Sequence, residues 1–300
     1  MEHGAPGVRA RRGPRFSNAE PAEAASRADV VFVALGHGES AHLMTSILEQ
    51  APRLVIDMAA DFRLADEESY RRHYGAHPNF ALAPRFVYGL SEARRDAVAR
   101  AECVANPGCM ATSAALALWP LAKEGLLPDD AAVFAVTGSS GAGGEPKPTT
   151  HHPFRASNLF VYKPLAHQHE AEIARVLSED AGRDLHPRLI AHSGPFVRGI
   201  HAAAHLRSEE FKDRDVRALY ADAYAREPFV TLRDEPPAVA DAQGTNHAHL
   251  FVKQQGREVL VLCVIDNLGK GAAGQAVQNM NIALGLPETD GLGAPGFFPY

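Results

Sequence analysis

The sequence contains little cysteine and no long apolar run. Its 300 residues include three cysteines, at positions 103, 109 and 263, which cannot all pair within one chain. Their spacing does not match a metal-ligand motif, so we expect no metal site built on cysteine. We expect the three thiols to be reduced, as in the cytoplasm. No apolar run approaches the ~20 residues of a membrane-spanning helix, and the first residues lack the apolar core of a secretory leader.

A strong excess of charge is also missing. Thirty basic side chains stand against 36 acidic ones, giving a net charge of −6, which favours neither nucleic acid nor an anionic membrane as a partner. What is present, 46% hydrophobic and 22% charged residues, is typical of a globular protein. The length suits two domains, each with its own core.

The first half of the chain has the pattern of a βαβ unit. An apolar run over residues 30–35 predicts a strand covered on both faces, Gly36 and Gly38 form a turn, and residues 40–50 have helical spacing. A second short strand follows at 54–56 and ends on Asp57. Ligands of such sheets bind at the carboxyl ends of the strands, where the stretches "LGHGES" and "DMAADFR" lie.

The second half has a different pattern, typical of an α+β domain. The stretch "AAVFAVTGSSGAGG" predicts a strand that enters a glycine-rich loop, and residues 249–265 predict a hairpin. Other segments read as antiparallel strands, interrupted by helices near 169–180 and 215–227. A last amphipathic helix is expected near 271–285. The overall fold class is therefore α/β, with a doubly wound unit before an α+β domain.

Cys109 lies in the stretch "NPGCMATSAALALWPL", which predicts a tight turn that opens a helix ended by Pro120. The free N–H groups and the positive dipole end of that helix favour a thiolate, so Cys109 is a candidate nucleophile. The alternative is a small buried residue that packs the turn.

His167 and His169, in "YKPLAHQHEAEI", are the candidate bases for such a nucleophile, since histidine titrates in the useful range. Either ring could instead cap a helix or lie hydrogen-bonded at the surface. A zinc site is a competing hypothesis, although no H-E-x-x-H motif is present; its candidate ligands would be His151, His152, His167, His169, His247 and His249. A cysteine peptidase is another, but the βαβ unit and the glycine-rich loop suit a nucleotide better than a polypeptide.

Eight ordered stretches together resemble one known family, the N-acetyl-γ-glutamyl-phosphate reductases of arginine biosynthesis, within a wider group that includes aspartate-semialdehyde dehydrogenase. The resemblance runs from about Arg27 to the C-terminus through "VFVALGHGES", "VIDMAADFRL", "VYGLSE", "NPGCMATSAALALWPL", "TGSSGAGG", "YKPLAHQHEAEI", "VRGIHA" and "VIDNLGKGAAGQAVQNMNIALGLPETDGL". It implies an oxidoreductase with a Rossmann-like NAD(P)-binding domain and a catalytic and oligomerisation domain of the semialdehyde dehydrogenase type.

The resemblance also implies roles for individual residues. Cys109 would attack an acyl phosphate to form a thioester, NADPH would reduce that thioester to an aldehyde, and His167 would be the acid/base. His169 and Arg198 would bind substrate, Arg198 through an anion, unless Arg198 forms an ordinary ion pair at the end of a strand. The residues that match cofactor-lining stretches are Gly36, Gly38, Ser140, Gly141, Ala142, Gly143 and Asn267.

Three segments are expected from this resemblance: a shortened cofactor domain at 1–108, a catalytic and oligomerisation domain at 109–270, and a C-terminal helix and tail at 271–300 that return to the cofactor domain. The cofactor domain is described as shortened because relatives begin with a strand and a G-x-x-G-x-x-G turn, and residues before Arg27 have no such pattern. Either the start is assigned downstream of the true one or the chain is truncated, and an inactive fragment or paralogue is the alternative to an enzyme.

The substrate is left open between two branches of the family. One reduces the free N-acetylated glutamyl phosphate; the other reduces an aminoadipyl or glutamyl phosphate carried on a small acidic protein for lysine or arginine synthesis. An acidic carrier would favour a basic surface at the mouth of the site, for which Lys147, Arg155 and Lys163 are candidates. A homo-oligomer, a dimer or tetramer, is also implied.

Overall fold

The computed structural model describes residues 16–296, and the N-terminal part of them forms a parallel sheet flanked by helices. Its strand order is β1-β2-β4-β3, and every pairing is parallel. The strands are β1 (Val30–Val33), β2 (Leu54–Asp57), β3 (Val87–Tyr88) and β4 (Cys103–Ala105), and the helices are α1 (Pro21–Ala25), α2 (Glu39–Leu48), α3 (Glu67–Tyr74) and α4 (Ser91–Val98). The predicted βαβ unit is confirmed as β1-α2-β2.

β1 differs from the strand that the apolar run predicts. β2 is buried throughout, but Phe32 on β1 is 40% exposed and Leu35, two residues past the end of the strand, is 43% exposed. These side chains are exposed because β1 is an edge strand: among the described residues it pairs only with β2. The residues before Phe16, on which the expected absence of a glycine-rich turn largely rests, lie outside the described part of the chain.

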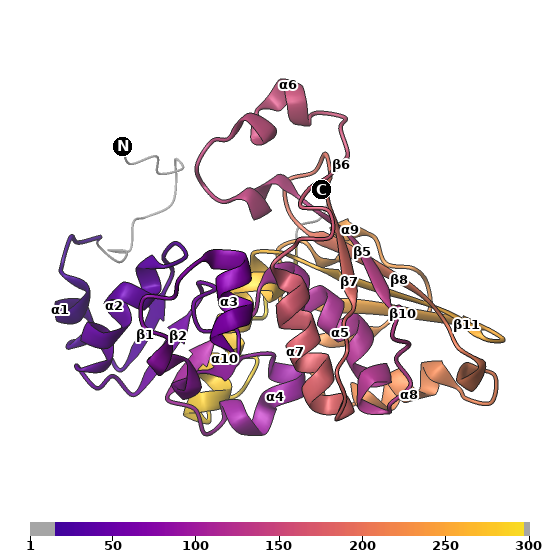
Figure 1. Cartoon of the computed structure of the whole chain (residues 1–300), viewed down its shortest axis with the longest axis horizontal. Helices are drawn as coiled ribbons and strands as arrows, with labels where there is room; N and C mark the ends of the chain where they lie inside the picture. Colours follow the sequence, from indigo (N-terminus) through magenta and orange to yellow (C-terminus); the bar gives the residue numbers. More distant parts are fainter. Residues whose placement is uncertain (1–15, 297–300) are drawn as a thin grey trace.

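α5 (Cys109–Lys123) begins at Cys109, as the turn signal predicts, and is the central helix of the molecule (Figure 1). Every residue from Met110 to Ala122 is buried, because the helix packs against α7 and against strands of the second sheet. The prediction that Pro120 ends the helix is wrong, since α5 continues to Lys123. A proline near the end of a helix removes one backbone hydrogen bond, and burial of Leu121 and Ala122 outweighs that loss.

The second sheet has seven strands in the order β6-β7-β5-β8-β11-β10-β9. Its strands are β5 (Ala132–Thr137), β6 (Phe160–Val161), β7 (Arg188–Ser193), β8 (Ile200–Arg207), β9 (Val230–Leu232), β10 (Ala248–Gln255) and β11 (Glu258–Ile265). The predicted hairpin is confirmed, because β10 and β11 pair antiparallel from Ala248↔Ile265 to Gln255↔Glu258. The sheet is mixed rather than antiparallel, since β5 pairs parallel with β7, and β10 with β9.

Helices cover one face of this second sheet. α5, α7 (His169–Ala181) and α8 (Val216–Ala223) lie on it, whereas the other face exposes side chains such as Phe134 and Leu260 (Figure 1). α10 (Gly274–Leu284) contacts α4 and β2 of the first sheet, following a π-helical turn, η5 (Gly269–Ala273). The chain thus returns to the first sheet after the second sheet is complete.

A long arm between β5 and α7 projects from the body of the molecule (Figure 1). It contains η2 (Ser139–Ala142), η3 (Pro148–Thr150) and α6 (His152–Arg155). The remaining short elements are η1 (Phe80–Arg85), η4 (Glu209–Phe211) and α9 (Val239–Ala242). Within residues 16–296, every helix is too short or too polar to span a lipid bilayer.

Candidate active site

A pocket of about 440 Å³ lies where the two sheets meet, at the carboxyl ends of the parallel strands. Cys109 and both expected histidines line it. Three structural regions supply the remaining wall: loops after β1, β2 and β4, the glycine-rich loop after β5, and the π-helical turn η5. The lining residues are His37, Met58, Arg63, Asn106, Pro107, Gly108, Cys109, Met110, Thr137, Ser140, Gly141, Gly143, Tyr162, His167, Gln168, His169, Asn267, Leu268, Gly271 and Ala272.

Two glycines allow the chain to close around Cys109. A Cβ on Gly108 would lie 2.4 Å from Nε2 of His169, and a Cβ on Gly271 would lie 2.8 Å from Cβ of Cys109. Both distances are shorter than any real contact, so a side chain at either position would displace the histidine ring or the nucleophile. The glycines therefore bring the first turn of α5, the start of α7 and η5 together at one point.

The pKa of the Cys109 thiol lies above its ordinary value because burial disfavours the thiolate. The Arg63 guanidinium lowers the pKa, and so does the backbone N–H of Met110 in the first turn of α5, the second effect as the sequence predicts, but burial outweighs both. The ground state is consequently a thiol, and a base must take its proton when it reacts.

His167 and His169 are adjacent in the pocket, with ring centroids 4.7 Å apart. The Nδ1 atom of His167 accepts a hydrogen bond from the backbone N–H of His169 at 3.2 Å. Burial lowers the pKa of His167 to about 3, and that of His169 to about 4. Both rings are therefore uncharged at neutral pH.

A buried carboxylate, Glu172, lies beneath these groups. Its Oε2 accepts hydrogen bonds from the backbone N–H of Gly108 at 2.9 Å and the hydroxyl of Tyr88 at 3.0 Å. Its Oε1 lies 3.2 Å from Nη1 of Arg63 and 3.7 Å from Nε2 of His169. Sequence analysis did not select Arg63 or Glu172, although the i,i+3 spacing of His169 and Glu172 places both on one helix face.

The expected cofactor residues divide into two groups. Ser140, Gly141, Gly143 and Asn267 line the pocket, and the amide of Asn267 donates to Oγ of Ser140 at 3.0 Å. Gly36, Gly38 and Ala142 do not line it; instead His37, between the two glycines, does.

Arg198, the expected substrate ligand, lies outside the pocket lining. Its Nε and Nη2 atoms lie 3.0 and 3.1 Å from the carboxylate of the buried Asp266. The arginine that lines the pocket is Arg63.

The expected basic surface is not assembled as predicted. Arg155 is buried and donates to Oγ of Ser193 and the carbonyl of Gly194, while Lys147 and Lys163 are exposed. The zinc hypothesis finds no support in residues 16–296, where no group of three or more His, Cys, Asp or Glu side chains is arranged to hold a metal ion.

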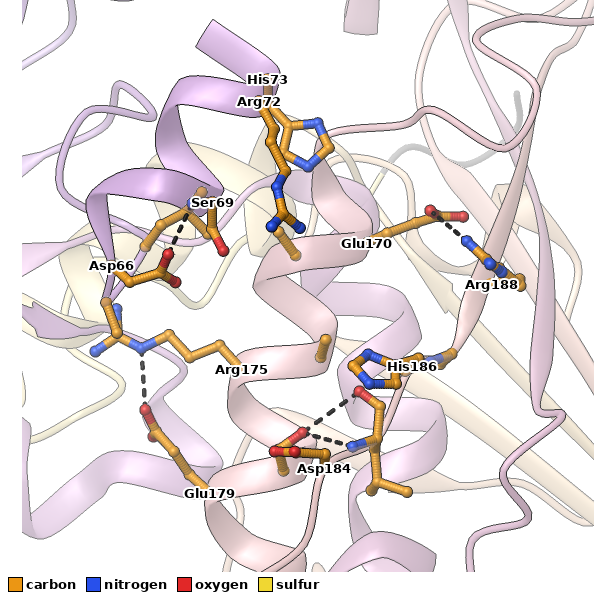
Figure 2. A pocket seen from close by; sticks show the side chains of 17 residues that line it. Asp66, Ser69, Arg72, His73, Glu170, Arg175, Glu179, Asp184, His186 and Arg188 are labelled. Carbon is orange, nitrogen blue, oxygen red and sulfur yellow. Dashed lines mark hydrogen bonds and ion pairs between the residues drawn. The ribbon is translucent and has the colours of Figure 1, made fainter. Parts of the chain in front are cut away.

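A second, slightly larger cavity of about 490 Å³ lies between α3 and the flank of α7 (Figure 2). Histidines, arginines and carboxylates line it too, but they are exposed or half-buried and several pair with one another, as Arg188 does with Glu170 at 3.5 Å and Arg175 with Glu179 at 3.0 Å. We refer to it below as the α3–α7 groove. The candidate nucleophile and bases, Cys109, His167 and His169, line the smaller pocket.

The fold and the pocket define a class: an NAD-binding domain joined to a mixed-sheet domain that carries a cysteine and histidines at their junction. Two family models match the chain accordingly, the semialdehyde dehydrogenase NAD binding domain over residues 4–101 and the semialdehyde dehydrogenase dimerisation domain over residues 109–267. The chain belongs to the semialdehyde dehydrogenase family, in the group of N-acetyl-γ-glutamyl-phosphate reductases and their LysW-linked relatives. Its members are oxidoreductases with a nicotinamide dinucleotide site.

Curated relatives place the chain within that group. It is 41% identical over 291 residues to the N-acetyl-gamma-glutamyl-phosphate reductase of Methanopyrus kandleri, covering 95% of this chain and 83% of the relative. It is also 41% identical over 309 residues to a protein of Thermomicrobium roseum named as a LysW-L-2-aminoadipate 6-phosphate reductase, covering 98% and 86%. Aspartate semialdehyde dehydrogenase II of Vibrio cholerae shares the fold, with a TM-score of 0.67 at 18% identity over 87% of this chain and 81% of that one.

Proposed function

We propose that the protein reduces N-acetyl-γ-glutamyl phosphate to the semialdehyde with NADPH, through a thioester on Cys109. The observation that carries this proposal is that Cys109, at the start of α5, lines the same pocket as two uncharged histidines. The relatives in the same group supply the substrate class.

The thiol of Cys109 loses its proton to a histidine and attacks the acyl carbon, and phosphate leaves. The sequence favours His167 as this base. The geometry supports His169 as well, because its Nε2 faces the Glu172 carboxylate while its Nδ1 is buried with no hydrogen-bond partner among the described residues. A proton held at Nε2 leaves Nδ1 as the basic atom. The N–H groups at the start of α5 would then stabilise the oxyanion of the tetrahedral state.

The pocket residues fit a nicotinamide ring. Gly143 has a positive φ of 89° with open space where its side chain would be, and Gly271 leaves room beside Cys109. Ser140, Gly141, Gly143 and Asn267 would hold the ring and its ribose, and the cofactor would supply the hydride that reduces the thioester.

Gly36, Gly38 and Ala142 would shape neighbouring turns. The N–H groups of Gly38 and Ala41, at the start of α2, already donate to Asp61 at 2.9 Å. These two N–H groups are therefore satisfied without a phosphate, and the two glycines contribute chiefly the turn that presents His37.

A carrier-linked aminoadipyl or glutamyl phosphate is the second candidate substrate. The Thermomicrobium roseum relative, at 41% identity, supports it, and the exposed Lys163 lies near the histidines that line the pocket. The position of Arg198 against Asp266 leaves its role as a substrate ligand a prediction.

The dimerisation-domain match and the exposed face of the second sheet support a homo-oligomer, a dimer or tetramer. All three cysteines are free thiols, which supports a cytoplasmic protein. The segments 1–108, 109–270 and 271–300 remain our proposed division of the chain, supported by α10, which packs on α4 and β2.

The test is the reverse reaction, in which the purified protein forms NADPH from N-acetylglutamate semialdehyde, NADP and inorganic phosphate. Formation of NADPH that requires phosphate supports the proposal. If the same assay is active only with a carrier-linked semialdehyde, the second substrate is the correct one. Inactivity with both substrates contradicts the proposal and favours a protein that keeps the fold without the activity.

A further inference from the structure

We propose that Lys270 is a positioning residue that holds the π-helical turn η5 against α4 and so fixes the pocket wall beside Cys109. Lys270 belongs to η5, yet its side chain is fully buried and lies outside the pocket lining. Its Nζ lies 2.6 Å from Oε1 of Glu92 on α4, which is buried as completely. The expected effect on cofactor binding rests on the proposed function, whereas the expected effect on the turn does not.

A buried lysine is uncommon, because its ammonium group loses the surrounding water. The other lysines of residues 16–296 are exposed, at positions 123, 147, 163, 212 and 253. Lys270 is compensated by Glu92 and by Oε1 of Gln278, each 2.6 Å from Nζ. Glu92 depends on the lysine in turn, because its Oε2 is buried with no hydrogen-bond partner among the described residues. Each charge is therefore stabilised chiefly by the other.

η5 has no other long side chain that could anchor it. Its sequence is GKGAA, and the two glycines leave the backbone free to adopt many conformations. The turn is nevertheless wound as a π-helix, in which the N–H of Gly271 donates to the carbonyl of Asp266, five residues earlier, at 2.9 Å. Such a turn is rare and needs support from its surroundings. The ion pair of Lys270 with Glu92 supplies that support from outside the pocket.

Another side of η5 forms part of the pocket wall. Gly271 and Ala272 line the pocket, and a Cβ on Gly271 would lie 2.8 Å from Cβ of Cys109. The carbonyl of Ala272 accepts a hydrogen bond from Nδ2 of Asn106 at 3.1 Å, which joins η5 to the loop before Cys109. Asn267, just before the turn, is one of the proposed cofactor ligands. A shift of η5 would therefore change both the cofactor wall and the space around the thiol.

Further polar groups surround the ion pair and connect both parts of the molecule. Nε2 of Gln278, on α10, donates to Oε1 of Glu288 at 2.7 Å. Glu288 pairs with Arg95 of α4, and Arg95 also pairs with Glu227, which follows α8. The network thus joins α4 on the first sheet, the last helix and a segment on the second sheet, and η5 is held between them.

Two variants separate positioning from stability. Lys270→Met removes the ammonium group and leaves Glu92 as a buried charge without its partner, so the thermal unfolding midpoint should fall. The double variant Lys270→Met/Glu92→Met replaces the pair with apolar side chains of similar volume, a change that is often neutral or stabilising. Its unfolding midpoint should return towards that of the wild type, although η5 has lost its charged anchor.

Cofactor binding is the first measurement on the double variant. We expect it to bind NADPH about tenfold more weakly than the wild type, because the wall that carries Asn267 is no longer fixed before the cofactor arrives. The Kd is obtained by titration of NADPH fluorescence. The matched control is Lys253→Met, which removes the same ammonium group from an exposed position on β10 and should leave the Kd unchanged.

Alkylation of Cys109 by iodoacetamide is the second measurement and needs no cofactor. It should be about threefold faster or more in the double variant, because Gly271 no longer covers the thiol. The groups that chiefly set the pKa of Cys109 do not include Lys270 or Glu92, so a faster reaction with an unchanged pH midpoint reports access to the thiol. Mass spectrometry follows the Cys109 peptide, with wild-type labelling expected in Lys253→Met.

The buried Cys103 and Cys263 are the internal references for unfolding. Faster labelling of Cys109 alone supports the proposal, whereas equally faster labelling of all three cysteines means a general loss of structure and overturns it. A folded double variant with a wild-type Kd or a wild-type rate of Cys109 labelling also overturns it. If the wild type itself binds no NADPH, the proposed function is contradicted and the labelling decides the role of Lys270.

If the double variant does not fold, Glu92→Gln decides. It keeps a hydrogen-bond acceptor for Lys270 but removes the opposite charge, and a neutral acceptor holds an ammonium group about half as strongly. Labelling of Cys109 should then be about twofold faster than in the wild type, with Cys103 and Cys263 unchanged. An unchanged rate at Cys109 would overturn the proposal.

Discussion

The pocket at Cys109 and the α3–α7 groove contain the same kinds of side chain and differ in almost everything else. In the groove, Arg188 is 58% exposed and pairs with Glu170 across 3.5 Å (Figure 2). In the pocket, the side chain of Arg63 is 8% exposed and that of Glu172 is 1% exposed. Water screens the first pair, and such pairs contribute little free energy, whereas the buried pair interacts strongly with every neighbouring charge. Burial, rather than residue type, distinguishes the pocket at Cys109 from the α3–α7 groove.

The histidines make the same point. Burial lowers the pKa of His167 to about 3, and desolvation is the largest cause. His186, in the groove, is exposed to solvent. A cavity of 490 Å³ is therefore a poorer guide to function in this molecule than one of 440 Å³ that contains buried, uncharged titratable groups.

The strongest test of the pocket is Cys109→Ser. We expect turnover to fall by at least about 10⁴-fold, because a hydroxyl at this position is a much weaker nucleophile than the thiolate. The side chain is nearly isosteric, so the thermal unfolding midpoint should remain that of the wild type. Turnover and the covalent acyl-enzyme, detected by intact mass, are the measurements, and wild-type turnover would exclude Cys109 as the nucleophile.

The next test separates the two histidines. We expect the acid/base variant, His167→Asn or His169→Asn, to lose about 10²- to 10⁴-fold in turnover, and the other to lose much less. The prediction from sequence names His167, while the carboxylate next to His169 favours the second ring. Steady-state turnover of the two variants, each checked for folding by circular dichroism, decides between them, and wild-type turnover in both would remove histidine from the mechanism.

A third test uses the pH dependence of stability. The unfolded chain protonates His167 below its ordinary pKa of 6.5, but the folded protein keeps the ring neutral down to about 3. The unfolded state thus binds more protons in this window, and stability falls as the pH falls from 6.5. His167→Asn should reduce that loss by about 2 kcal/mol between pH ~7 and ~4.5, measured by urea unfolding. Parallel pH profiles of the variant and the wild type would contradict the buried, uncharged state.

The smallest effect is expected in the α3–α7 groove. Arg188→Gln should change the free energy of unfolding by no more than about 0.5 kcal/mol and leave turnover unchanged, because Arg188 is 58% exposed and lies 3.5 Å from its partner Glu170. A loss of turnover above about tenfold would mean that the groove takes part in catalysis and that the contrast with the pocket is wrong.

Local signals account for the parts of the site that the sequence predicts. The turn before Cys109 and the polar stretch before His169 mark the starts of two helices, α5 and α7, and both helices begin at those residues. The pairing of Arg63 with Glu172 spans 109 residues, and no periodicity or capping pattern connects them. Arg198 illustrates the reverse error, because a guanidinium that suits an anionic substrate in isolation lies against Asp266 in the folded protein.

The sequence by itself determined the βαβ unit, the hairpin of β10 and β11, the helix that starts at Cys109 and the family to which the chain belongs, since these depend on spacing, turn residues and ordered motifs. Only the tertiary structure decided that β1 lies at an edge, that α5 continues through Pro120, and that the thiol and both histidines are uncharged. Solvent exclusion and distances between charges set these properties, and both arise from segments that are remote in the chain and adjacent in space.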